Sequence, residues 1–174
     1  MALFYRLFLA FNSTFLIIIV YLIKESYKLN ILASFSRYYS WVLFLLLPVI
    51  LTAISFWVAK LLATDAINDS SVREIELANN SFLPTYLGYF FVSLGIEDVP
   101  TLVVVFLIIY VFTFLSQSLY FNPIFLLFGY QFYFIKTASN IKVFLITRKA
   151  LKKPGDDGFD NLKRINDYTF IDME

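Results

Sequence analysis

A stretch of 37 residues without a charged side chain, Val99 to Ile135, limits the fold of this sequence more than any other feature. Its first part, Thr101 to Phe121, is almost entirely apolar. A helix needs about 20 such residues to cross a hydrocarbon core about 30 Å thick. The part after Asn122-Pro123 is too short for a second crossing. The stretch therefore predicts one crossing, an end at Asn122-Pro123, and a C-terminal segment delivered to one side.

The composition supports a membrane protein. Hydrophobic residues make up 60% of the chain, against about 45–50% in ordinary soluble domains. We predict an α-helical membrane protein with four transmembrane helices, alternatively three. The expected spans are residues 4–23, 41–62, 80–96 and 101–121. The third span leaves the number open, because Pro84, Gly88 and Gly95 weaken an already short apolar segment.

The distribution of Lys and Arg predicts the side on which the C-terminus lies. Of the 14 Lys and Arg residues, 11 fall on the side of the C-terminus, whether the chain has four spans or three. Cytoplasmic loops carry an excess of these residues. Both topologies therefore predict a cytoplasmic C-terminus, and the count does not decide between them.

Residues 124–174 are expected to form a small cytoplasmic β-element, separate from a helical transmembrane part of residues 1–123. Tyr130–Lys136 and Ile141–Arg148 are rich in aromatic and β-branched residues, and turn-type residues separate them. This pattern is typical of a β-hairpin. Arg164–Ile171 is a third candidate strand, and three strands are about the minimum for an independently stable sheet.

The stretch Thr64–Glu76 is the first clearly aqueous segment of the chain. It contains several acidic residues and Arg73. We expect one short amphipathic helix here, with Ser71 as its N-cap.

The spans contain polar residues but no charged residue in their core. Intramembrane ionisable groups usually mark ion-coupled transport, so their absence argues against a secondary transporter. The chain has no His and no Cys, which excludes His-based zinc sites and thiol nucleophiles. We therefore expect no enzyme activity, no metal site and no cofactor. Asn12-Ser13-Thr14, within the first span, favours an interhelical contact over a substrate site.

A polar band near the inner end of the last span contains Thr113, Ser116 and Gln117. Small, hydrogen-bonding side chains at this depth usually face other helices. Gly88 and Gly95, seven residues apart, lie on one helix face and favour close packing there. We interpret all five as helix-packing residues. The alternative is an oligomeric channel or pore-forming effector that uses the polar band, since hydrophobic constrictions can gate without charges.

A basic cluster follows the second candidate strand. It is predicted to bind a cytoplasmic protein partner, and the alternative is attraction to anionic lipid of the inner leaflet. From Lys136 onward the chain has eight basic and six acidic residues, so direct nucleic-acid binding is not expected. The residues of the cluster are Arg148, Lys149, Lys152 and Lys153.

The C-terminal half contains Asn122-Pro123, Gly129-Tyr130, Phe132-Tyr133 and a strand that ends in Leu145–Lys149. With the hydrophobic segments before it, this pattern resembles KwaA, the membrane subunit of the Kiwa anti-phage defence system. The resemblance implies a four-span, homo-oligomeric protein of the bacterial inner membrane and a cytoplasmic partner, KwaB, which acts on phage DNA. It also implies a membrane-embedded sensor or anchor that recruits or activates this partner, without catalytic residues of its own.

Overall fold

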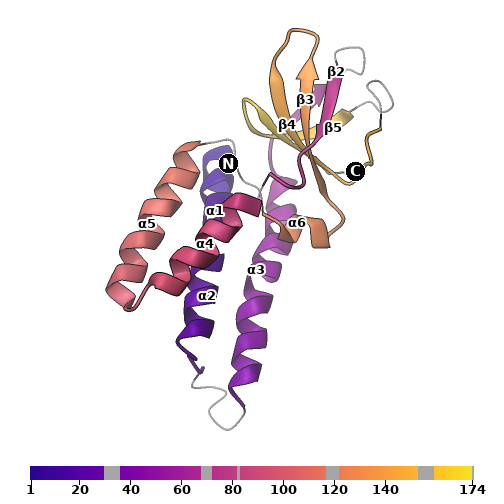
Figure 1. Ribbon diagram of the computed structural model, residues 1–174. Coiled ribbons are helices and arrows are strands. Elements are labelled where there is room, and N and C mark those ends of the chain that lie inside the picture. Colours follow the sequence, from indigo (N-terminus) through magenta and orange to yellow (C-terminus); the bar gives the residue numbers. More distant parts are fainter. Residues whose placement is uncertain (30–35, 68–71, 82, 117–121, 153–158, 174) are drawn as a thin grey trace.

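The computed structural model describes residues 1–29, 36–67, 72–81, 83–116, 122–152 and 159–173. Its helices lie at one end of the molecule and a β-sheet lies at the other (Figure 1). The N-terminus of the first helix lies at the end of the helices nearest the sheet. The architecture is therefore mixed, with a helical part and a sheet that share one boundary.

Among the described residues, three helical stretches are long and apolar enough to cross a membrane, judged by length and composition. The first is α1 (Ala2–Thr14) and α2 (Leu16–Lys24), with only Phe15 between them. The others are α3 (Arg37–Ala59), which continues through Pro48, and α5 (Val99–Ser116). They correspond to the predicted spans 4–23, 41–62 and 101–121, although residues 117–121 lie outside the described ranges.

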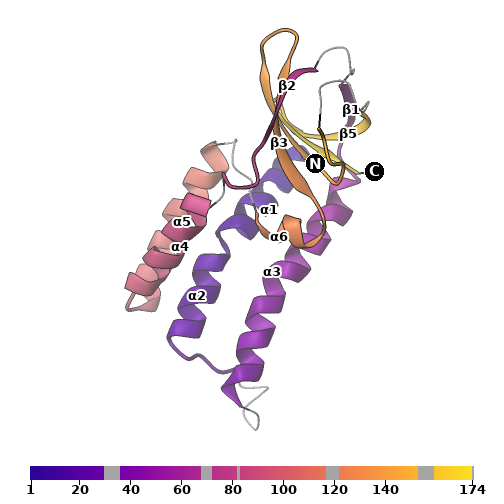
Figure 2. The ribbon, with the colours of Figure 1, turned by 45° about the vertical axis from the view of Figure 1, so that its right-hand side comes forward.

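The predicted span 80–96 corresponds to α4 (Leu83–Gly95), a helix of 13 residues. The α4 helix packs against α2, because the Ser93 hydroxyl donates to the Ile17 carbonyl at 3.0 Å. The Lys24 ammonium, at the end of α2, donates to the Ile96 carbonyl. The turn between α4 and α5 therefore lies beside the end of the first helical stretch, with α4 and α5 as a hairpin (Figure 2).

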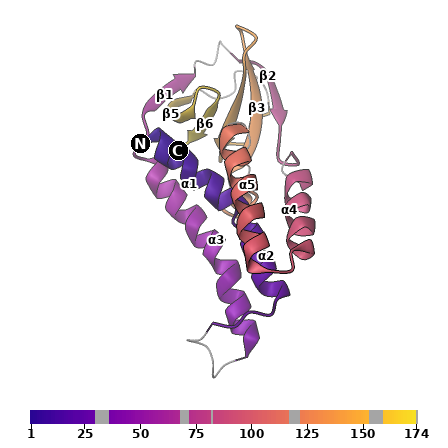
Figure 3. The same ribbon diagram turned by 90° about the vertical axis from the view of Figure 1, so that its left-hand side faces the viewer.

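Within the part of the chain that the structure describes, the sheet has six strands in the order β1-β5-β6-β4-β3-β2. All neighbours are antiparallel except β4 and β6, which are parallel. The strands are β1 (Thr64–Ile67), β2 (Val72–Leu77), β3 (Gln131–Thr137), β4 (Lys142–Thr147), β5 (Phe159–Asn166) and β6 (Thr169–Asp172). Figure 3 shows β1 and β2 at opposite sides of the sheet above the helices.

The expected hairpin is confirmed as β3 and β4. In their pairing, Gln131 lies opposite Thr147 at one end and Lys136 lies opposite Lys142 at the other. The helix expected in 64–76 is wrong, because this stretch contributes both edge strands. Its β2 strand pairs with β3, and Glu74 and Glu76 form ion pairs with Lys136 and Lys142 across the strands. Ser71, the expected N-cap, lies outside the described residues.

The third expected strand, 164–171, is two strands instead of one. The chain turns between β5 and β6, and the Asn166 side-chain oxygen accepts from the Tyr168 amide at 2.8 Å. Such a bond from an Asn side chain to the backbone two residues on stabilises a tight turn. The boundary between the helical part and the β-element is expected from the sequence at residue 123. The sheet also includes β1 and β2, which come before that position.

Both faces of the central hairpin are buried, which explains why residues 132–135 of β3 and 143–146 of β4 are apolar at every position. Phe132, Phe144 and Ile146 belong to a core shared with α1 and the end of α3. Ile135 and Leu145, among others, face the opposite way, into a second core with residues of β2, β5 and β6. The first core joins the sheet to the helices.

The second core predicts a large difference between two isoleucines of the same hairpin. Ile135 is fully buried, whereas Ile141 is 47% exposed. Ile135→Ala is expected to lower the free energy of unfolding by about 2–5 kcal/mol, and Ile141→Ala by no more than about 0.5 kcal/mol. Denaturant unfolding of the purified protein in detergent measures both. Equal losses would contradict the described packing of the sheet.

Candidate functional site

A single buried hydroxyl connects three distant parts of the chain. The Thr52 Oγ1, on α3, donates to the Pro48 carbonyl at 2.8 Å. The same oxygen accepts from the Asn12 amide on α1 at 3.0 Å and from the Asn122 amide at 3.1 Å. A hydroxyl has one donor and two acceptor positions, so these bonds use its full capacity. We call Asn12, Thr52 and Asn122 the polar junction.

Asn122 also sets the conformation of the chain where it approaches the sheet. Its side-chain oxygen accepts from the Ile124 amide at 3.0 Å, at the start of α6 (Ile124–Leu127). Its backbone carbonyl accepts from the Phe125 amide at 2.9 Å. The joint expected at Asn122-Pro123 is therefore a buried anchor, held by its side chain to α3.

The Asn12-Ser13-Thr14 patch is an interhelical contact, as expected from the sequence. Asn12 reaches α3 through Thr52, and the Ser13 carbonyl accepts from the Tyr86 hydroxyl of α4 at 3.2 Å. Thr14 bonds back to the Ala10 carbonyl of its own helix. The patch thus ties α1 to two other helices. The Asn12 Oδ1 is buried without a hydrogen-bond partner among the described residues.

An aromatic stack continues from the polar junction to the sheet. Phe56 lies one helical turn after Thr52, and its ring stacks on Tyr130 with a centroid distance of 4.5 Å and an interplanar angle of 13°. The same ring meets Phe125 of α6 edge-on at 4.8 Å. The Arg148 guanidinium lies over the Tyr130 ring, 4.6 Å from its centre. We call Phe56, Tyr130 and Arg148 the aromatic bridge.

The electrostatics of the aromatic bridge keep the Tyr130 phenol neutral. Burial raises the pKa of the Tyr130 hydroxyl above its usual value, and the nearby Asp172 acts in the same direction while Arg148 opposes both. A neutral ring beside a guanidinium is attracted through its π face. The contact therefore attaches Arg148 to the helical part without an ion pair.

The structure separates the roles of the four predicted partner-binding residues. Arg148 is exposed and lies in the aromatic bridge. Lys149 is half-buried, and its ammonium is 4.0 Å from the carboxylate of Asp172, which is itself buried and accepts from the Thr147 hydroxyl at 2.8 Å. Lys149 thus helps to neutralise the buried Asp172. Lys152 is exposed, and Lys153 lies outside the described residues.

The predicted polar band is only partly described. The buried Thr113 shares a 3.2 Å hydrogen bond with the Tyr89 hydroxyl and so joins α5 to α4. The Ser116 hydroxyl donates to the Thr113 carbonyl of its own helix at 3.0 Å. Gln117 lies outside the described residues.

Gly88 and Gly95 do not pack against another helix of this chain. A Cβ atom added at either position would meet nothing within 4 Å. Both lie on the open side of α4. Their role as helix-packing residues stays a prediction.

Sequence reasoning missed Thr52 and Phe56, although a signal for them exists. Thr52 stands four residues after Pro48, and Phe56 stands four residues after Thr52. Residues four apart share one helix face. A hydroxyl placed one turn after an intrahelical proline therefore marks the helix face that carries Thr52 and Phe56.

Within the described ranges, no three acidic side chains lie close enough together to hold a metal ion.

The polar junction predicts a cost for removing one hydroxyl. Thr52→Val leaves the Asn12 and Asn122 amides without an acceptor and is expected to lower the free energy of unfolding by about 1–3 kcal/mol. Thr52→Ser keeps the hydroxyl and is the matched control. Unfolding in detergent measures both variants. If Thr52→Val is no less stable than Thr52→Ser, the junction contributes nothing.

Comparison with known proteins supports one family. The family described as anti-phage protein KwaA matches residues 5–171. Comparisons with curated proteins and with solved structures found no match. Because the family match covers nearly the whole chain, this protein belongs to the KwaA family of anti-phage proteins.

Proposed function

We propose that this protein is the membrane-embedded sensor or anchor subunit of a bacterial anti-phage defence complex. On this proposal it has no enzyme activity of its own. Its sheet lies in the cytoplasm and recruits or activates a DNA-acting protein partner. The observation that carries the proposal is the aromatic bridge, which connects a membrane-type helix directly to the basic cluster of the sheet.

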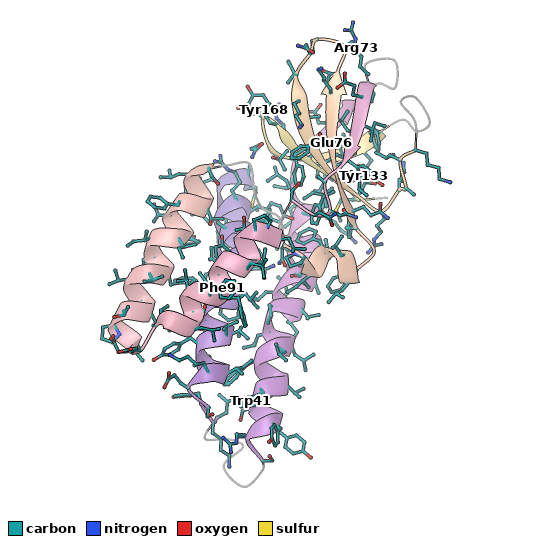
Figure 4. The ribbon with its side chains drawn as sticks, in the orientation of Figure 1. Trp41, Arg73, Glu76, Phe91, Tyr133 and Tyr168 are labelled. Carbon is teal, nitrogen blue, oxygen red and sulfur yellow. The ribbon has the colours of Figure 1, made fainter. Side chains whose placement is uncertain are left out.

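The dimensions of the helical part support insertion in a membrane. Arg6 and Lys24 delimit the uncharged part of the first helical stretch, and the 18 residue steps between them span about 27 Å at 1.5 Å per residue. This length matches a hydrocarbon core of about 30 Å. Trp41 lies near the end of α3 away from the sheet (Figure 4), and the exposed Trp57 lies near its other end. Aromatic side chains at both ends are typical of membrane interfaces.

The pairing of the sheet supports four crossings instead of three. The edge strands β1 and β2 precede α4 and α5, and the strands β3 to β6 follow them. Strands of one sheet lie on one side of a membrane, so the chain between β2 and β3 crosses an even number of times. The α4 helix is short, but its end lies beside Lys24, at the depth where the first stretch ends. We therefore propose that α4 and α5 both cross.

This arrangement puts the N-terminus, the sheet and the C-terminus together. That side contains 11 of the 14 Lys and Arg residues, which favours the cytoplasm. The opposite side contains the loop after Lys24 and the short turn after α4. The proposed setting is the inner membrane, with most of the water-exposed surface on the cytoplasmic side.

The proposed signal is a movement of α3 relative to the sheet. Many apolar side chains of α3, among them Leu46 and Ile50, are exposed on its surface and would face lipid. The opposite face of the same helix presents Thr52 to the polar junction and Phe56 to the aromatic bridge. A tilt or rotation of α3 would therefore move Tyr130 and, through it, Arg148. The bilayer and the partner-binding surface would be linked by two contacts on one helix face.

The polar band gives little support to the alternative of a channel. The Thr113 hydroxyl is already shared with Tyr89 inside the chain, and Ser116 bonds to its own helix. Hydroxyls used in this way are not free to line a pore. Homo-oligomer formation remains part of the proposal, because large apolar side chains are exposed along the whole length of α5.

Charge reversal tests partner recruitment. A variant with Arg148, Lys149, Lys152 and Lys153 changed to Glu is expected to lose co-purification of its cytoplasmic partner while it stays in the membrane fraction. A control reverses Arg73, an exposed cation of β2 at the other end of the β3–β4 hairpin, and is expected to keep the partner. Because Lys149 pairs with the buried Asp172, a Lys152→Glu, Lys153→Glu variant checks the result without this structural residue. Normal co-purification in both reversed variants of the cluster would rule out this docking surface.

Cysteine labelling tests the four crossings. The sequence contains no Cys, so single cysteines report one position each. Ala66→Cys in β1 and Ser139→Cys after β3 are expected to react with a membrane-impermeant thiol reagent from the same side. Glu97→Cys, in the turn between α4 and α5, is expected to react only from the other side. Labelling of positions 66 and 139 from opposite sides would show that the chain crosses an odd number of times between them.

A further inference from the structure

The first helical stretch has a weak point just beyond the polar junction. Phe15 separates α1 from α2, and its carbonyl accepts from the amides of both Ile18 and Ile19, at 3.1 and 3.2 Å. A bond to the residue three positions on belongs to the 3₁₀ helix, which inside an α-helix often marks a hinge. The Thr14 hydroxyl donates to the Ala10 carbonyl at 3.0 Å, and bonds of this kind bend helices. The stretch is therefore expected to bend most easily at residues 14–15.

The α3 helix has a weak point at Pro48. Proline has no N–H group, so the helix lacks the bond that residue 48 would donate to the Phe44 carbonyl, and the proline ring crowds that carbonyl. Kinks in helices occur mostly at such positions. The Pro48 carbonyl also accepts from the Thr52 hydroxyl, a second bond from a side chain to its own helix. The α3 helix continues through Pro48, but its resistance to bending is expected to be lowest there.

The two weak points lie at about the same depth. Asn12 and Thr52 share a hydrogen bond and so mark one level. Phe15 is three residues beyond Asn12, which is about 4.5 Å along a helix. Pro48 is four residues before Thr52, which is about 6 Å. Because α1 runs away from the sheet and α3 runs toward it (Figure 1), both positions lie on the side of the polar junction away from the sheet. One plane, about a helical turn beyond the junction, crosses both weak points.

Two separate cores lie on either side of this plane. Before it, Tyr5 and Leu9 of α1 belong to the core shared with the end of α3 and the sheet. After it, Ile17 and Tyr21 of α2 belong to another cluster, with residues of α4, of α5 and of the turn between them. The first helical stretch therefore connects two packed parts, a sheet-side part and a far part, and changes from one to the other at Phe15.

The contacts of α4 and α5 with α1 permit small movements between the two parts. The Tyr86 hydroxyl donates to the Ser13 carbonyl at 3.2 Å, and the Tyr110 hydroxyl donates to the Leu7 carbonyl at 3.3 Å. Both distances exceed the range of about 2.5–3.0 Å that is usual for hydroxyl donors. The Tyr110 ring meets Phe11 edge-on at 6.5 Å. Long bonds and ring-edge contacts tolerate a small shift better than interlocked side chains do.

We propose that Phe15 and Pro48 form a hinge at which the far part moves when the thickness of the bilayer changes. This inference rests on the membrane arrangement proposed above. Helices that do not match the thickness of the hydrocarbon core adapt by tilting or kinking, and the two weak points allow this without disruption of either core. The polar junction lies one turn away, so the movement acts first on Thr52. The proposed movement of α3 thus begins at Pro48.

Distances between spin labels, measured by pulsed electron paramagnetic resonance, test the hinge. The sequence contains no Cys, so labels can be placed at chosen sites. Val42→Cys, at an exposed position on the far half of α3, is paired with Ser139→Cys, at an exposed position after β3. The full chain is placed in bilayers of short-chain or of long-chain phosphatidylcholine. The distance between these labels is expected to differ between the two bilayers. A control pair on the sheet side, Leu61→Cys with Ser139→Cys, is expected to give the same distance in both.

Two substitutions that restore regular helix test the location of the hinge. Pro48→Ala restores the missing amide, and Thr14→Val removes the hydroxyl but keeps a β-branched side chain of similar size. The combined variant is expected to lose most of the difference in distance between the two bilayers, and each single variant is expected to lose part of it. Leu47→Ala, at an exposed position beside the proline, is the matched control and is expected to keep the full difference.

The same distance between positions 42 and 139 in both bilayers would overturn the hinge. An equal change in the control pair would also overturn it, because the movement would then lie within the sheet-side part. A difference that persists undiminished in the combined variant would exclude Phe15 and Pro48 as its location. If Pro48→Ala perturbs the fold, Thr14→Val gives the deciding result. Recruitment of a partner is measured separately by co-purification, and its failure would count against the proposed function and not against the hinge.

Discussion

The hydroxyl of Thr52 is the contact that holds α1, α3 and the segment leading from Asn122 to the sheet in one arrangement, beside the core shared by helices and sheet. It accepts from Asn12 on α1 and from Asn122 at the start of α6, and it donates to its own helix. Away from water, an amide without a partner is costly, so the three segments are held in one arrangement. The next turn of the same helix face carries Phe56, whose ring stacks on Tyr130. Two adjacent turns of α3 therefore determine where the sheet lies relative to the first helical stretch and to α6.

The sheet imposes a second constraint, which acts on the topology. Its two edge strands come from between the helices, and its four inner strands come from the C-terminal segment. The chain leaves the sheet after β2, forms the α4–α5 hairpin and returns to the sheet at β3. This connection places α4 among the helices although it has only 13 residues. Its hydrogen bonds to Ile17 and Lys24 of α2 hold it beside a full-length helix. The protein belongs to the KwaA family of anti-phage proteins. The membrane setting and the partner-binding surface of this architecture are our proposal, in which Tyr130 connects Phe56 of α3 to Arg148.

Sequence reasoning predicted the features whose causes are local. The β3–β4 hairpin follows from aromatic and β-branched residues on either side of a turn, and the long helices follow from uncharged apolar stretches. The β2 strand was missed because its partner strand is about 60 residues away. Glu74 favours a strand only once Lys136 of β3 lies opposite it, and Glu76 reaches Lys142 of β4, one strand further on. Asn122 was recognised as the end of a segment, but its bond to Thr52 joins residues 70 positions apart. Of the residues predicted to bind a partner, Lys149 looked equivalent to Arg148, and only the fold reveals its neighbour Asp172.

The central claim is that the helices act on the sheet through the polar junction and the aromatic bridge. Protection of bacteria against phage, measured as efficiency of plating, tests this claim most directly in cells that express Thr52→Val or Thr52→Ser at equal membrane levels, with partner binding verified in each. The account predicts that Thr52→Val loses protection although its partner is still bound, whereas Thr52→Ser keeps it. Full protection by Thr52→Val would contradict the claim, because the helices and the sheet would then work together without the contact that joins them.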